Sequence, residues 1–312
     1  MEIKIIETES NKRIDNFLAK KFINIPKVVI FKMLKKGQIK VNNKRVKYNY
    51  ILLTNDIINI KKDLESFDLK NFFDVKKKVL NIIYEDENIC LINKPIGILS
   101  IDKNNSKSIT IQNLFLDHLE QKQEYQSQVK KEFIPSICNR LDFNTSGIII
   151  AAKNKFSWDE INQLIKKHQI DKYYLALVFN KPKLEHEILE AYHYKNSENN
   201  LVYVSDTPKK GYKKIITEYW VKASNSKYSL LKIKLVTGKT HQIRAHLNHI
   251  QLPIVGDKKY KNKNNNFDTR FKTQALISYK IKFNIKNKQS KLLYLDQQTF
   301  KINDIWFAKY IN

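Results

Sequence analysis

The chain has 312 residues, 42% of them hydrophobic, which is enough for a small and a large hydrophobic core. Its 57 Lys and Arg against 31 Asp and Glu give a net charge of +26, which is uncommon among enzymes of small metabolites and favours a polyphosphate partner, nucleic acid above all. Two distant cysteines, Cys90 and Cys138, exclude a disulfide framework and a CxxC zinc site, and no apolar stretch approaches the ~20 residues that cross a bilayer, so we expect a cytoplasmic protein without a membrane segment.

Residues 1–62 predict a small basic α/β domain. Apolar residues at helical spacing predict one helix from Arg13 through Phe22 and a second from Lys27 to Lys35, and Gly37 ends the second helix before short strands. The segment holds 15 Lys and Arg against 5 Asp and Glu, so its net charge is +10. A fifth of the chain therefore carries more than a third of the excess charge.

The rest of the chain divides into a linker, residues 63–78, and a larger domain, residues 79–312. Short β-rich segments with few strand–helix–strand alternations predict an α+β fold, built on a mainly antiparallel, mixed sheet with flanking helices. No GxGxxG or GxxxxGK[ST] pattern supports a nucleotide cofactor. The expected strands are 80–84, 89–93, 148–152, 173–179, 215–221 and 230–236, and the expected helices are 108–121, 155–167 and 240–250.

The segment from Arg140 to Ala152 contains the strongest catalytic candidate. Asp142 follows Arg140 closely and precedes a turn that ends at Gly147 and leads into an apolar, β-branched run. The chain has only 6 glycines, so a glycine at this position predicts a positive φ or a close backbone approach. A carboxylate held between a cation and a tight turn suggests a positioned catalytic aspartate, although an ordinary solvated loop would contain the same residue types.

The N-terminal module resembles the S4 RNA-binding domain. The resemblance is carried by the stretches Arg13–Leu18, Pro26–Lys27, Leu34–Asn43 and Asn55–Ile58. Asn55 stands where this family usually has Gly, and Asn also tolerates a left-handed turn. In the family the second helix and the loop after it face the RNA backbone, whereas the alternative is a merely solvated helix face. The resemblance thus implies RNA contacts by Arg13, Lys27, Lys32, Lys35, Lys36 and Lys40.

Five motifs of the larger domain follow one another in a characteristic order. They are Asn93–Gly97, Arg140–Gly147, Lys172–Val178, Thr237–Arg244 and Pro253–Asp257. Together with the S4-like module they make the chain similar to the RluA family of pseudouridine synthases over nearly its whole length. The resemblance implies an RNA substrate, with large-subunit ribosomal RNA as the expected target, and a reaction that uses neither a metal nor a cofactor.

The resemblance also implies the chemistry. A carboxylate acts on a uridine, the uracil leaves C1′, rotates and rejoins through C5, and this requires a cation that orients the carboxylate and an aromatic ring against the base. By motif position these roles fall to Asp142, Arg244 and Tyr174, and Tyr174 is also expected to assist removal of the C5 proton. The expected substrate-contacting residues are Arg140, Ile243, Lys94 and His241, of which Lys94 is interpreted first as structural.

Three positions depart from the family pattern, since Asn139 and Gln274 stand where His is frequent and Ile215 stands where a small residue is usual. Two functions of other classes remain open. A catalytically idle RNA-binding or ribosome-assembly protein would keep the second domain as a scaffold, whereas a metal-dependent hydrolase would need ligands such as His241, His246 and His249, for which no HExxH pattern exists. The default oligomeric state is a monomer.

Overall fold

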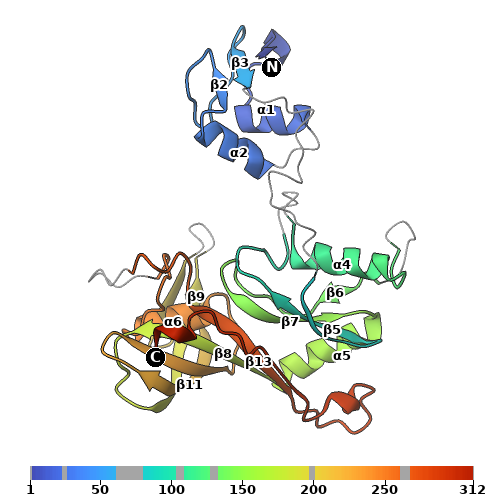
Figure 1. Ribbon diagram of the computed structural model, residues 1–312, viewed down its shortest axis with the longest axis vertical. Coiled ribbons are helices and arrows are strands. Elements are labelled where there is room, and N and C mark those ends of the chain that lie inside the picture. Colours follow the sequence, from blue (N-terminus) through green and yellow to red (C-terminus); the bar gives the residue numbers. More distant parts are fainter. Residues whose placement is uncertain are drawn as a thin grey trace. The chain divides into compact units, whose positions relative to one another are not determined.

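The computed structural model describes residues 2–22, 27–60, 80–102, 109–126, 133–196, 201–260 and 268–311. The chain divides into two units, Met1–Val79 with Asp102–Ile109 and Leu80–Ile101 with Thr110–Asn312 (Figure 1). The linker expected at residues 63–78 lies outside the described residues. No helix in the described ranges is long and apolar enough to cross a membrane.

The N-terminal unit packs two helices against a three-stranded sheet (Figure 1). The expected helices are present as α1 (Ile14–Lys21) and α2 (Lys27–Lys35), because their apolar residues recur at helical spacing and bury Ile14, Leu18, Ile30 and Leu34 in one core. The antiparallel sheet has the order β1-β3-β2. Its strands are β1 (Glu2–Lys4), β2 (Ile39–Val41) and β3 (Ile57–Ile60), and a short 3-10 helix spans Glu7–Glu9.

A buried carboxylate joins the loops of this unit. Asp56 accepts hydrogen bonds from Asn42 Nδ2 at 2.8 Å, Tyr50 OH at 3.1 Å and Leu53 N at 2.9 Å. The residue before it, Asn55, has φ 70°, which confirms that asparagine supplies the left-handed turn where the S4 pattern has glycine.

The larger unit is built on one sheet of eleven strands, and the expected α+β class is confirmed. Nine strands follow the order β10-β9-β11-β12-β8-β13-β7-β5-β4, β14 pairs with β13, and β6 pairs with β7. Only the pair of β13 with β7 is parallel among the described residues. The strands are β4 (Ile82–Glu85), β5 (Ile89–Lys94), β6 (Ser136–Ile137), β7 (Ser146–Ala152), β8 (Ile170–Phe179), β9 (His186–Lys195), β10 (Val202–Ser205), β11 (Lys213–Ser224), β12 (Tyr228–Leu235), β13 (Leu276–Phe283) and β14 (Thr299–Lys301).

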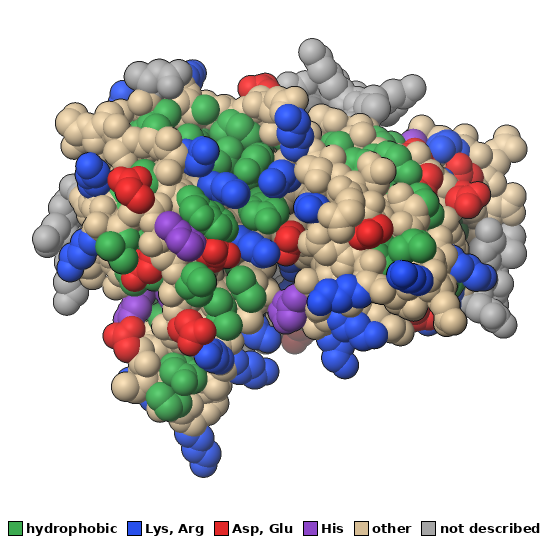
Figure 2. All heavy atoms as spheres, turned by 90° about the horizontal axis from the view of Figure 1, so that it is seen from below, with side chains coloured by type: hydrophobic (Ala, Val, Ile, Leu, Met, Phe, Trp, Pro, Cys, Tyr) green, Lys and Arg blue, Asp and Glu red, His purple; other side chains and the backbone are tan. Residues whose placement is uncertain are grey.

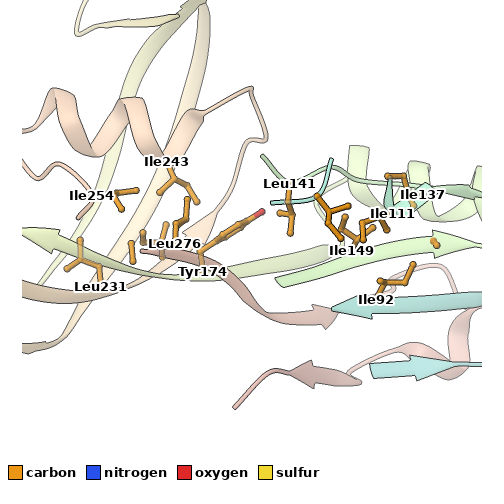
Figure 3. Packing of buried hydrophobic residues seen from close by; sticks show 14 of the residues in the cluster. Ile92, Ile111, Ile137, Leu141, Ile149, Tyr174, Leu231, Ile243, Ile254 and Leu276 are labelled. Carbon is orange, nitrogen blue, oxygen red and sulfur yellow. The ribbon is translucent and has the colours of Figure 1, made fainter. Parts of the chain in front are cut away.

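Helices flank both faces of this sheet. Alternating residues of a strand point to opposite faces, so Ile92 of β5 packs with Phe115 of α4 (Ile111–Gln121), whereas Ile89 packs with Ile161 of α5 (Lys155–Lys166). The core under α4 continues under α6 (Gln242–His249) through Ile243 (Figure 3). Two further 3-10 helices span Leu293–Leu295 and Ala308–Tyr310.

Gly147 allows the close approach that joins the two halves of the sheet. Its φ is 118°, and a Cβ at this position would lie 2.2 Å from the carbonyl oxygen of Ser278 on β13. Both the positive φ and the close approach that the sequence offered as alternatives are therefore present. Because Ser278 pairs with Gly147 on one side and with Tyr174 on the other, β13 sets the loop before β7 next to the start of β8.

Candidate active site

A pocket of about 630 Å³ lies where the loop before β7, strand β8 and the N-terminus of α6 meet. It brings together most of the site residues that the sequence suggested, although these are separated by as much as a hundred residues along the chain. Lys94 does not line it. The predicted residues that line it are Arg140, Asp142, Tyr174, His241, Ile243 and Arg244.

Tyr174 extends from β8 into this pocket. Its ring is 5% exposed and lies near Ile243 and Leu276, and its hydroxyl points toward the segment that carries Leu141 (Figure 3). Burial, with the negative charge of Asp142, raises the pKa of Tyr174 to about 12. The phenol is therefore neutral at pH 7, and Tyr174 presents an uncharged ring to the pocket.

Arg244 is held rigidly between two carboxylates. Its Nε and Nη2 donate to the two oxygens of Asp257 at 2.6 and 2.9 Å, and its Nη1 donates to Asp142 Oδ2 at 2.7 Å. Burial alone would lower the pKa of Arg244, but the two carboxylates outweigh it and raise the pKa. The bidentate pair with Asp257 fixes the guanidinium plane, so the remaining nitrogen reaches Asp142 in one orientation.

The turn before α6 is cross-linked by a buried amide. Gln242 Oε1 accepts from Thr237 Oγ1 at 2.9 Å and from Lys239 N at 3.0 Å, while its Nε2 donates to Ile216 O at 3.0 Å and Thr217 Oγ1 at 3.1 Å. All four hydrogen-bonding capacities of the amide are used. Gln242 thus fastens the turn to β11 and sets the direction in which α6 presents Arg244.

His241 has a left-handed backbone, with φ 52° and ψ 20°, at the N-cap of α6. The hydroxyl of Tyr260 accepts from Val202 N at 3.1 Å and lies 2.8 Å from His241 Nδ1, so its own proton is available to that nitrogen. Burial lowers the pKa of His241 to about 4, which leaves the imidazole neutral at pH 7; if the Tyr260 hydroxyl donates to Nδ1, the proton of the imidazole sits on Nε2. That Nε2 lies 3.8 Å from Asp142 Oδ2.

Lys94 lies beneath the loop before β7 instead of in the pocket. It is fully buried, and its Nζ donates to the carbonyls of Pro95 at 2.9 Å, Ile98 at 2.8 Å and Phe143 at 3.1 Å. Burial lowers its pKa to about 8, against the opposing effect of Asp142. With all three protons engaged, Lys94 positions the backbone next to Asp142, and no donor remains for a substrate.

Several cations line the pocket, and the sequence did not single out all of them. Lys172 lies two residues before Tyr174 on the same face of β8, and no carboxylate of the described chain lies within ion-pair distance of it. Burial lowers its pKa. The other cationic residues lining the pocket are Arg140, Lys195, Lys239 and Lys259.

The three residues that depart from the family pattern are either hydrogen-bonded or buried. Asn139 Oδ1 accepts from Ile150 N at 2.7 Å, and Gln274 Nε2 donates to Thr145 Oγ1 at 2.7 Å, so both amides support the loop before β7. Ile215 is fully buried in β11. Among the described residues no group of three or more His, Cys, Asp or Glu side chains could hold a metal ion, and His246 instead contacts Thr217 Oγ1 at 3.0 Å.

The suggested RNA contacts of the N-terminal unit differ in their environment. Lys35 and Lys36 are exposed and Lys40 is partly exposed, whereas Arg13 is paired with Asp15 at 2.8 Å. The side chains of Lys27 and Lys32 lie outside the described residues.

Two residues that the sequence did not assign to the site, Asp257 and Tyr260, hold Arg244 and His241. Asp257 is the last residue of the Pro253–Asp257 motif, and Tyr260 follows it by three residues.

The fold and this pocket define an RNA-modifying enzyme with a small RNA-binding module. Residues 88–249 match the family model described as RNA pseudouridylate synthase, and residues 12–58 match the S4 domain. The chain belongs to the RNA pseudouridylate synthase family and is an RNA pseudouridine synthase. An RNA pseudouridine synthase of Mycoplasma genitalium is 36% identical over 289 residues, which cover 88% of this chain and 86% of that protein.

Other similar proteins have more specific names. Ribosomal large subunit pseudouridine synthase C of Buchnera aphidicola subsp. Acyrthosiphon pisum is 33% identical over 261 residues, 80% of this chain and 77% of its own. Among solved structures, human RNA pseudouridylate synthase domain containing 4 superposes with a TM-score of 0.57 at 19% identity, covering 73% of this chain and 89% of that chain. That likeness supports the fold of the larger unit.

Proposed function

We propose that this enzyme isomerises uridines of large-subunit ribosomal RNA, acting as a cytoplasmic monomer, and that Asp142 is the reacting carboxylate. The observation that carries the proposal is the placement of Asp142 in the pocket that Tyr174 lines, with Oδ2 held 2.7 Å from Arg244 Nη1. The choice of RNA is supported by the relatives named as ribosomal large subunit pseudouridine synthase C.

The two oxygens of Asp142 are not equivalent. Arg244 binds Oδ2, and His241 Nε2 lies nearest to the same oxygen, whereas no described residue donates a hydrogen bond to Oδ1. Oδ1 is therefore the oxygen that meets the ribose carbon C1′ of a bound uridine. Arg244 disperses the charge on the carboxylate and holds its orientation through the reaction.

The reaction needs no external reagent. The N1–C1′ bond breaks, the uracil turns, and a C5–C1′ bond forms; C5 loses a proton and N1 gains one, so the atoms balance. The neutral ring of Tyr174 offers a stacking surface for the detached uracil, and Ile243 closes the pocket beside it. The base reaches this pocket only after it leaves its stack, which costs a few kcal/mol, and phosphate contacts at the pocket lysines offset that cost.

Tritium release from RNA labelled at uridine C5 tests both parts of the proposal. The wild type is expected to release tritium from unmodified large-subunit ribosomal RNA, and Asp142→Asn is expected to release none above background. Asp159→Asn, which removes a half-exposed carboxylate of α5, is the matched control and is expected to keep full activity. Release from transfer RNA but not from ribosomal RNA would overturn the target, and release by Asp142→Asn would overturn the catalytic assignment.

A further inference from the structure

The sheet of the larger unit has a second basic surface on the side opposite the pocket. Side chains alternate along β8, so Tyr173 faces away from the side that carries Tyr174. The strand register sets Lys234 of β12 and Lys280 of β13 beside Tyr173, and Lys301 of β14 beside Lys280. We call this surface the back face; its members are Tyr173, Trp220, Lys232, Lys234, Lys280, Lys282 and Lys301.

The lysines of the back face exceed the acids that could neutralise them. Asp171 binds Lys234 at 3.0 Å, and Glu218 binds His186 at 2.9 Å. The other four lysines of the back face have no carboxylate of the described chain within ion-pair distance. Burial lowers the pKa of Lys280, and the nearby charges of Lys232 and Lys282 lower it further, against the opposing effect of Asp171.

Two aromatic rings hold the lysines together despite this repulsion. Lys280 Nζ lies 4.2 Å from the centre of the Tyr173 ring, and Lys232 Nζ lies 5.1 Å from the same ring and 4.3 Å from the Trp220 ring. Trp220 also stacks on His186 at 5.0 Å. Because these rings are already covered by protein groups, the back face is suited to bind phosphates and not to stack bases.

We propose that the back face binds the phosphate backbone of RNA as a second RNA-contacting surface of the catalytic unit, independent of base sequence. RNA is the occupant that the charge requires, since four uncompensated lysines need a polyanion and the enzyme acts on RNA. Figure 2 shows one face of the molecule, on which Lys and Arg side chains are interspersed with apolar and acidic side chains. A large folded RNA presents phosphates on many helices and can contact both sides of the sheet, whereas a short hairpin fills the pocket alone.

The proposal rests on RNA being the substrate and not on the identity of the target or of the reacting carboxylate. The test variant replaces Lys232, Lys280 and Lys282 with Gln, and the matched control replaces the exposed Lys166, Lys167 and Lys183 with Gln, so that both lose three charges. Affinity for full-length large-subunit ribosomal RNA and for a short hairpin is measured as salt rises. Circular dichroism confirms that both variants remain folded.

For the long RNA, the slope of log affinity against log salt is expected to become shallower by about 2 to 3 in the test variant and to stay unchanged in the control, because each lost phosphate contact removes roughly 0.7 to 0.9 from the slope. Affinity for the hairpin stays at the wild-type value. Amine-reactive labelling read by mass spectrometry should show Lys232 and Lys280 protected by the long RNA. Equal slopes in all three proteins, an equal loss in the control, or no protection would overturn the proposal, and absence of protection would direct attention to an acidic protein partner.

Discussion

Replacing Tyr260 with Phe should slow the reaction through His241, without touching the substrate. The change keeps the ring that lies 5.2 Å beneath the Arg244 guanidinium and removes only the hydroxyl. His241 Nδ1 then loses the donor 2.8 Å away, and the neutral imidazole loses the reason to keep its proton on Nε2. We expect a decrease in kcat with little change in KM, because His241 Nε2 lies 3.8 Å from Asp142 Oδ2, whereas the lost hydroxyl contacts only His241 and Val202.

The size of this effect follows from the bonds that are removed. A neutral hydrogen bond contributes about 1 kcal/mol, which is a factor of roughly five in the tautomer ratio and sets an expected decrease in kcat of about 3- to 10-fold. Protein stability should fall as well, by about 1 to 3 kcal/mol, because the buried amide of Val202 loses its acceptor. The two effects are separable, since only the first depends on the imidazole.

Substitution of His241 by Gln separates the effect of Tyr260→Phe on kcat from its effect on stability. A Gln amide nitrogen can stand where Nε2 stands and cannot change tautomer, and glutamine tolerates the left-handed backbone, as Gln123 and Gln251 of this chain show with φ 62° and 61°. In the His241→Gln background, Tyr260→Phe should leave kcat unchanged while still lowering stability. Nitrogen-15 NMR of labelled histidine reads the tautomer directly. A proton on Nδ1 in the wild type, or the same loss of kcat in both backgrounds, would refute the reasoning.

Three further changes have expected outcomes. Gly147→Ala should cost at least ~2 kcal/mol of the free energy of unfolding in a urea titration, because its Cβ would overlap the Ser278 carbonyl at a positive φ; a cost under ~0.5 kcal/mol would contradict the close approach. Lys94→Met should lower stability by about 3 kcal/mol and also lower kcat, because three buried carbonyls lose their donor; an unaffected kcat would mean that Lys94 does not position Asp142. Burial lowers the pKa of His246 to about 4, below the 6.5 of the unfolded chain, so the unfolded state binds more protons between these two pH values. The free energy of unfolding should therefore fall as the pH drops from 6.5 to 4, by at most about 3 kcal/mol. The variant His246→Gln should weaken this pH dependence, and an unchanged stability profile would exclude His246 as its source.

The sequence predicted the helices of this fold better than some of its strands. Helix α5 was expected at residues 155–167 and spans Lys155–Lys166, because its apolar residues keep a clean helical period. Strands β9 (His186–Lys195) and β13 (Leu276–Phe283) were not expected. The first contains glutamate, leucine and alanine, which favour helices in isolation, and its strand conformation is imposed by pairing with β11.

For the candidate site, residue types were predictable from motifs but their division of labour was not. Lys94 and Lys172 both lie in motifs, yet Lys94 donates its three hydrogen bonds to backbone carbonyls under the loop, whereas Lys172 lines the pocket. Tyr260 lies just beyond the last motif, and its partner His241 precedes it by nineteen residues. Sequence spacing contains no information on such pairs, because they depend on how the turn before α6 is fastened to β11.

Adjacent residues of β8 show how one strand can serve both surfaces of an RNA enzyme. Tyr174 enters the pocket, while Tyr173 holds lysines on the back face, and only the alternation of side chains along the strand separates the two roles. A one-residue shift of β8 against β13 would exchange them and would set a lysine-ringed tyrosine where the base must stack. The close approach of Gly147 to Ser278 fixes β13 against β7, whereas the pairing of Ser278 with Tyr174 is what fixes β8 against β13. The placement of Asp142 and Tyr174 around one pocket therefore depends on the register of β13 with both of its neighbours, and the pairing with β7 is the one that requires a glycine.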